Sequence, residues 1–185
     1  MTEKETQSKE PETRAELKMS DIDRQFKNEV KNIPGGERLM MCFQCGTCTA
    51  DCPIARFSDS YRPRQILRMA QLGLKDMVLS SDQLWLCAAC YTCVDHCPQD
   101  VEISSVIRAL RNIAVREKYL PIVFKELAGA ILETGLAYKI PELRLKRRQE
   151  AGLPPLPKAN LDAVSKLFIK TGFSKAIGKG GNSRA

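Results

Sequence analysis

Two cysteine runs of identical spacing constrain the fold of this chain more than any other feature. Each run follows the pattern C-x₂-C-x₂-C-x₃-C and is followed directly by a proline, Pro53 or Pro98. The runs contain all eight cysteines of the 185-residue chain, namely Cys42, Cys45, Cys48, Cys52, Cys87, Cys90, Cys93 and Cys97. A repeat that uses every cysteine predicts a pair of related sites built on thiol ligands.

The spacing is that of the ferredoxin-type run, which binds 4Fe–4S clusters. Three cysteines placed two residues apart let a short loop wrap three corners of a cubane. The fourth cysteine lies too far along the chain to close the same cube comfortably, so we expect it to reach the other cluster. The predicted ligands of cluster 1 are Cys42, Cys45, Cys48 and Cys97. The predicted ligands of cluster 2 are Cys87, Cys90, Cys93 and Cys52.

Structural zinc and disulfide bonds are the alternative explanations for clustered cysteines. Zinc sites use four ligands, commonly as two C-x₂₋₄-C pairs, which does not explain a third cysteine and a fourth before proline in both runs. Residues 1–18 contain no apolar signal-peptide region, so we expect a cytoplasmic protein, where cysteine clusters more often bind metal. The most apolar stretch, 127–140, is interrupted by Glu133 and Lys139, so we expect no membrane span.

Apolar residues recur at helical spacing along the chain, and no segment alternates as a strand would. Helices are predicted over 20–33, 63–73, 75–86, 103–114, 121–138 and 161–170. Ser20, Ser104 or Ser105, and Asn160 are the predicted N-caps, and Pro63 is suited to a first helical turn. The predicted fold is all-α, with added helices at both ends of the part that holds the two 4Fe–4S clusters.

Composition divides the chain into four predicted parts. Residues 1–19 are poor in apolar side chains and predict a disordered arm. Residues 20–120 form the predicted two-cluster domain, and 121–177 a C-terminal helical extension that includes a stiff proline-rich linker at 153–157. The glycine-rich residues 178–185 predict a flexible tail.

The formal net charge of +7 is concentrated in the C-terminal half of the chain. Residues 101–185 carry 16 basic and 7 acidic side chains, a net charge of +9. Such a region would suit an acidic partner or nucleic acid, but a solvated helix surface is the ordinary explanation, and we expect no nucleic-acid partner. His96 is expected to be a surface histidine, and Trp85 to pack in the core against the loop of the second run.

The residues around the two runs resemble a known family. The 34 residues between Cys52 and Cys87 have helical character, similar to the α-helical ferredoxin domain of succinate dehydrogenase and fumarate reductase iron–sulfur subunits. This resemblance implies an α-helical ferredoxin-type domain that holds two 4Fe–4S clusters. The segments CFQCGTCTADCPIARFSDSYRPRQILRMAQLGL and LWLCAACYTCVDHCPQDVEISSVIRALRNIA resemble the C subunit of the soluble heterodisulfide reductase of methanogenic archaea. This resemblance covers roughly residues 35–120.

The resemblance implies a role in methanogenesis, as an electron-transfer subunit of an oxidoreductase. Single electrons would pass from a flavin-bearing A subunit to a catalytic B subunit that reduces the CoM–S–S–CoB heterodisulfide, in a larger complex with a hydrogenase or formate dehydrogenase. The chain has no Cys-Cys dipeptide and no G-x-G-x-x-G after a strand, so no catalytic residue and no flavin or nicotinamide site is expected. The alternatives are a relay subunit of another dehydrogenase or a zinc-stabilised nucleic-acid-binding module.

Overall fold

The computed structural model describes residues 17–177, and this range contains helices and no strand. The all-α prediction is therefore confirmed for the described part of the chain. Most of the predicted N-terminal arm and the whole predicted tail, residues 1–16 and 178–185, lie outside the described residues. Residue 19, the last of the predicted arm, begins a single 3₁₀ turn, Met19–Asp21.

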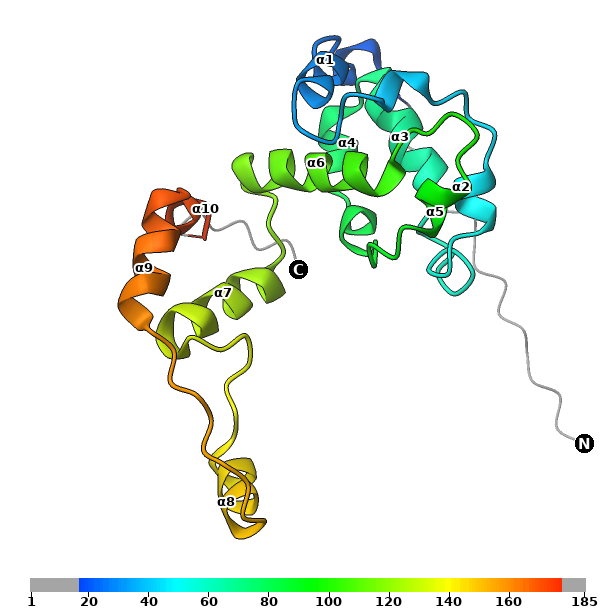
Figure 1. Ribbon diagram of the computed structural model, residues 1–185. Helices are drawn as coiled ribbons and strands as arrows, with labels where there is room; N and C mark the ends of the chain where they lie inside the picture. The colour runs from blue at the N-terminus through cyan, green and yellow to red at the C-terminus, as the bar shows by residue number, and fades with distance from the viewer. Residues whose placement is uncertain (1–16, 178–185) are drawn as a thin grey trace, which may run out of the picture.

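Ten α-helices and three 3₁₀ helices follow one another along the described part of the chain (Figure 1). They are η1 (Met19–Asp21), α1 (Phe26–Lys31), η2 (Leu39–Met41), α2 (Thr47–Ala50), α3 (Pro63–Leu72), α4 (Lys75–Leu79), η3 (Asp82–Trp85), α5 (Thr92–Asp95), α6 (Ile103–Arg116), α7 (Ile122–Thr134), α8 (Glu142–Glu150), α9 (Leu161–Lys170) and α10 (Phe173–Ile177).

Helix α6 lies at the centre of the bundle and contacts α1, α3, α4, α5 and η3. Its apolar residues recur at intervals of three and four, which places them on one face of the helix. Six of these side chains are at most 2% exposed, namely Ile103, Val106, Ile107, Leu110, Ile113 and Ala114. Because each fully buried aliphatic side chain contributes about 1.5–3 kcal/mol, this face is a main source of stability.

The predicted ends of two helices are confirmed, because local signals set them. Helix α3 has Pro63 in its first turn and ends at Gly73, whose φ of +81° favours glycine. Helix α9 has Asn160 as its N-cap, and the Asn160 side-chain oxygen accepts a hydrogen bond of 3.0 Å from the Ala163 N–H.

The prediction of a first helix capped by Ser20 was wrong. Helix α1 begins only at Phe26, because contacts with another element hold the preceding segment in a turn. The Asp23 N–H donates to the Gly73 carbonyl at 2.8 Å, and the Asp23 carboxylate accepts from the Gln25 N–H at 2.9 Å. Residues 20–25 therefore pack against the C-terminal end of α3 and do not extend α1.

The structure corrects three other helix boundaries. The N-cap of α6 is Glu102, and Ser104 and Ser105 lie buried in the first turn of the helix. The helix predicted over 75–86 is divided into α4 and η3, where the Ser81 hydroxyl caps η3. The helix that follows Pro121 stops at Thr134, since Gly135 adopts a φ of +72°.

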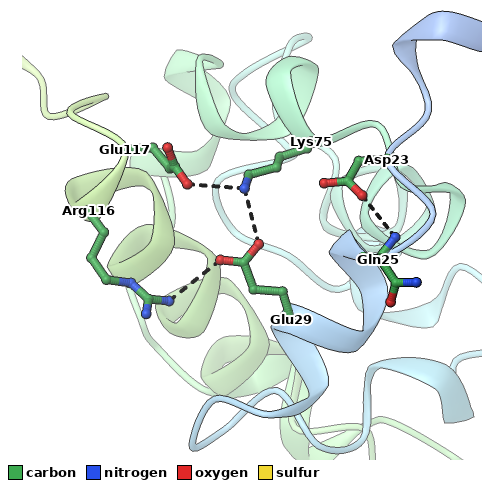
Figure 2. A network of polar contacts seen from close by, with 6 residues as sticks. All are labelled: Asp23, Gln25, Glu29, Lys75, Arg116 and Glu117. Atoms are coloured by element: carbon green, nitrogen blue, oxygen red, sulfur yellow. Dashed lines mark hydrogen bonds and ion pairs between the residues drawn. The ribbon is translucent and has the colours of Figure 1, made fainter.

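A network of charged side chains joins three helices of the bundle (Figure 2). The Lys75 ammonium lies 3.1 Å from a carboxylate oxygen of Glu29 on α1 and 3.1 Å from one of Glu117 at the end of α6. Arg116 reaches the second Glu29 oxygen at 3.9 Å. Burial alone would lower the pKa of Lys75, but the hydrogen bonds and charges of the two carboxylates together raise it.

Helices α7 to α10 extend away from this bundle, and α8 lies farthest from it (Figure 1). The Trp85 and Phe124 rings, with centroids 5.0 Å apart, join η3 to α7. Helix α8 carries the basic residues Arg144, Lys146, Arg147 and Arg148 and buries none of its side chains. Among residues 17–177, no helix has the length and apolar character needed to cross a membrane.

Candidate iron–sulfur site

The two cysteine runs fold as an internal structural repeat, in which adding 45 to a residue number of the first run gives its equivalent in the second. A 3₁₀ helix precedes each run, η2 and η3, and places a fully buried leucine, Leu39 or Leu84, three residues before the first cysteine. A four-residue helix, α2 or α5, contains the third cysteine. Helices α2 and α5 contact each other, so the two runs lie side by side.

Each run contains two residues with left-handed backbone conformation, at equivalent positions. Gln44 and Gly46 have φ values of +68° and +94°, and Ala89 and Tyr91 have values of +51° and +64°. Three of these residues are not glycine, so each conformation costs about 1–2 kcal/mol. Alternation of left- and right-handed residues forms a concavity of backbone N–H groups, which suits an anionic cluster.

The cysteines line two separate cavities. The cysteines of cavity 1 are Cys42, Cys45, Cys48 and Cys97. The cysteines of cavity 2 are Cys52, Cys87, Cys90 and Cys93. Each cavity thus brings together the first three cysteines of one run and the last cysteine of the other.

The cysteines within each run differ in burial and in pKa, and the two runs repeat the difference. The Thr47 hydroxyl lies 3.5 Å from the Cys45 sulfur, and the Thr92 hydroxyl lies 3.5 Å from the Cys90 sulfur; these contacts lower the pKa of both exposed thiols. Burial raises the pKa of Cys48 to about 11, and burial also raises the pKa of Cys93. The neighbouring thiols add to this rise, because thiolates repel one another.

The donor set and surroundings of each cavity fit a 4Fe–4S cluster. Four thiol sulfurs are available at each cavity, and a positively charged iron–sulfur core would relieve the repulsion among their thiolate forms. The other walls are largely apolar, with Val101 and Ile103 at cavity 1 and Tyr61 and Pro63 at cavity 2. Within residues 17–177, no three His, Cys, Asp or Glu side chains converge as the ligands of a single metal ion would.

Two residues that the sequence analysis did not single out hold the cysteine runs in place. The Gln71 amide on α3 donates to the carbonyls of Leu39 and Cys42, at 3.0 and 2.9 Å. The Arg111 guanidinium on α6 donates to the carbonyls of Leu84 and Cys87, at 2.9 and 2.8 Å. The signal that could have found them is the register of the two helices, in which adding 40 to a residue number of α3 gives its equivalent in α6.

The structure also places the two side chains whose roles the sequence left open. His96 is half-exposed, as expected for a surface histidine, and its Nδ1 lies 2.7 Å from an Asp51 carboxylate oxygen. Asp51 and His96 are equivalent positions of the repeat, so this contact joins the two runs. Trp85 is partly buried against the core, and its ring contacts Phe124 of α7 and the Arg111 guanidinium, 5.6 Å from the ring centroid.

Comparison with known proteins agrees with this chemistry. Residues 38–101 match the family model described as a 4Fe-4S dicluster domain. This segment contains both cysteine runs, η2, η3 and the helices from α2 to α5. The chain therefore contains an iron–sulfur domain.

Relatives extend the similarity to most of the chain. It is 36% identical over 168 residues to the C subunit of the H(2):CoB-CoM heterodisulfide,ferredoxin reductase of Methanothermobacter thermautotrophicus, covering 88% of this chain and 90% of the relative. It is 40% identical over 146 residues to the iron-sulfur C subunit of the CoB–CoM heterodisulfide reductase of Methanopyrus kandleri, covering 76% of each chain. Identity at this level over this much of both chains shows that the protein belongs to the family of heterodisulfide reductase C subunits.

Proposed function

We propose that this chain is the electron-transfer subunit of a CoB–CoM heterodisulfide reductase and holds two 4Fe–4S clusters, one in each cavity. The observation that carries the proposal is the lining of the cavities, each with three cysteines of one run and the fourth of the other. The proposed ligand sets are Cys42, Cys45, Cys48 and Cys97 for cluster 1, and Cys87, Cys90, Cys93 and Cys52 for cluster 2.

A bound 4Fe–4S cluster supplies one-electron transfer without making or breaking a bond in a substrate. The chain contributes the thiolates, the hydroxyls of Thr47 and Thr92 beside two of them, and largely apolar walls. Because α2 and α5 contact each other, the two sites are neighbours, as electron exchange between them requires.

Single electrons are proposed to pass through this chain from a flavin-bearing A subunit to the catalytic B subunit, which reduces the heterodisulfide. The names of the relatives support membership of such a complex, and the name of the Methanococcus maripaludis relative, 36% identical over 175 residues, includes H(2) and formate. Exposed apolar residues of α7, with Ile122 and Val123 each 65% exposed, offer surface for partner subunits. A hydrogenase or formate dehydrogenase is the proposed further partner.

The test begins with anaerobically purified protein and proceeds to single-cysteine variants. The wild-type chain should contain about eight iron and eight acid-labile sulfide per chain, and dithionite should reduce it. The EPR signals lost in Cys45→Ser and Cys90→Ser would distinguish the two clusters. Cys97→Ser should then perturb the signal that Cys45→Ser removes, although Cys97 belongs to the same run as Cys90.

Several outcomes would contradict the proposal. Stoichiometric zinc without sulfide would exclude the clusters, and loss of the Cys90 signal in Cys97→Ser would exclude the crossed ligand sets. The loaded chain alone should not reduce the heterodisulfide, and turnover in the absence of the other subunits would exclude a pure electron-transfer role. Purification from the native source should recover the chain with the flavin-bearing and catalytic subunits.

A further inference from the structure

The internal repeat extends beyond the cysteine runs to the helices that follow them. Helix α3 follows the first run and α6 follows the second, and adding 40 to a residue number in α3 gives its equivalent in α6. Under this relation Gln71 corresponds to Arg111, and the carbonyls that they bind also correspond, Leu39 with Leu84 and Cys42 with Cys87. The same structural contact is therefore made by a neutral amide in one half and by a cation in the other.

The Arg111 guanidinium is held firmly at the second run. Its Nε donates to the Leu84 carbonyl at 2.9 Å and its Nη2 to the Cys87 carbonyl at 2.8 Å, while the group lies over the Trp85 ring. The side chain is only partly exposed. A cation that is ordered and shielded from solvent acts more strongly on neighbouring charge than an exposed, screened one.

Hydrogen bonds to sulfur distinguish the two cavities by only one neutral group, since four groups lie beside the cysteines of cavity 1 and three beside those of cavity 2. At cavity 1 they are the Gln44 amide, the Thr47 and Thr49 hydroxyls and the Val101 N–H. At cavity 2 they are the Tyr61, Thr92 and Ser104 hydroxyls. The extra group at cavity 1 is neutral, whereas Arg111 brings a full positive charge to the second run, so this charge is the larger difference in the polar surroundings.

The other charged residues near the runs favour neither cavity strongly. Arg108 lies 3.4 Å from the Tyr91 hydroxyl of the second run, but its side chain is exposed and its charge is screened by solvent. Arg64 lines cavity 1, but its side chain is exposed and its charge is screened by solvent. The Asp51 carboxylate lies in the chain between Cys48 and Cys52, which line different cavities, so its charge acts on both.

We propose that Arg111 makes the cluster at cavity 2 the better electron acceptor, so that electrons move through the chain from cavity 1 to cavity 2. This inference rests on the proposed function. Reduction adds one negative charge to a cluster, and a fixed cation nearby stabilises the reduced form and raises its potential. In the step itself one electron leaves the cluster at cavity 1, oxidising it, and reduces the cluster at cavity 2, with no bond change and with an external one-electron reductant restoring the first.

The test is an EPR-monitored redox titration of the complete, cluster-loaded chain, with the signals assigned by Cys45→Ser and Cys90→Ser. In the wild type, the cavity 2 cluster should have the higher midpoint potential. Arg111→Gln replaces the cation with the kind of amide that Gln71 has in the first run. In this variant the midpoint potential of the cavity 2 cluster should fall by about 59 mV, which is a tenfold change in the equilibrium constant for electron transfer between the clusters. Arg111→Lys retains the charge and should restore most of the difference.

Gln71→Arg provides an independent test that does not remove any contact of Arg111. It places a cation at the equivalent position of the first run and should raise the potential of the cavity 1 cluster by a similar factor. Two control variants remove one positive charge elsewhere. Arg116→Gln, farther along α6 and paired with Glu29, should shift neither potential, and Arg64→Gln should shift the cavity 1 potential by less than Arg111→Gln shifts that of cavity 2.

The possible results separate this inference from the proposed function. Two clusters whose potentials do not respond to Arg111→Gln or Gln71→Arg would overturn the inference and leave the proposed function intact. A lower potential at cavity 2 than at cavity 1 in the wild type would also overturn it, as would a larger effect of Arg64→Gln than of Arg111→Gln. Absence of iron and sulfide from the wild-type chain would overturn both.

Discussion

Replacement of Gly73 by alanine should destabilise the bundle strongly, because this residue ends α3 and holds the segment before α1. Gly73 has a φ of +81°, and a Cβ there would lie inside the contact distance of the Asp23 carbonyl oxygen and 3.3 Å from the Ile22 Cγ2. The left-handed conformation costs alanine about 1–2 kcal/mol. Displacing the Asp23 backbone adds about 1–3 kcal/mol. Weakening the 2.8 Å hydrogen bond from the Asp23 N–H to the Gly73 carbonyl adds about 1 kcal/mol.

The expected loss for Gly73→Ala is therefore about 3–6 kcal/mol of unfolding free energy. Urea denaturation of anaerobic, cluster-loaded protein, followed by far-UV circular dichroism, should show a midpoint lower by about 1.5–3 M, at a slope of about 2 kcal/mol per molar urea. Gly129→Ala is the matched control, since a Cβ on this α7 residue meets nothing within 4 Å. It should stabilise α7 by about 0.5–1 kcal/mol, because alanine is the better helix former.

Gly73→Asn separates the two causes of the loss. Asparagine tolerates the left-handed conformation but has the same Cβ, so it should remain destabilised by most of the steric cost. Recovery of near wild-type stability in Gly73→Asn would show that backbone conformation alone matters. A Gly73→Ala midpoint within error of the wild type would refute the packing of residues 22–23 against the end of α3.

Two further predictions concern the bundle around α6. Lys75→Met should lower the unfolding free energy by about 1 kcal/mol at pH 7, since it removes both ion pairs of the network. Because the pKa of Lys75 is raised in the folded state, the stabilisation by Lys75 is fully present below the unfolded pKa of 10.5 and is lost as pH rises through the folded pKa. The urea midpoints of wild type and Lys75→Met should therefore converge only in strong alkali. A constant difference between the midpoints across that pH range would contradict the ionic cause. Leu110→Ala should cost about 2–5 kcal/mol, since Leu110 is 0% exposed at the centre of the core, and a loss below 1 kcal/mol in the same assay would contradict its burial.

Local signals in the sequence determined much of this protein. The spacing of the eight cysteines predicted the iron–sulfur domain, which the family comparison supports. Pro63 and Gly73 fixed the ends of α3, and Asn160 fixed the start of α9. Each of these signals acts through neighbours within a few residues along the chain, so sequence alone could predict them.

Only the tertiary structure decided where α1 begins and which side chains bind the backbone carbonyls of the cysteine runs. The helical pattern around Ile22 was overridden by a hydrogen bond from Asp23 to Gly73, 50 residues farther along the chain. Gln71 binds the carbonyl of Cys42, 29 residues before it, and Arg111 binds that of Cys87, 24 residues before it. These contacts require the helices to be packed first, because they join backbone groups of one element to side chains of another. For that reason no spacing within either segment could predict them.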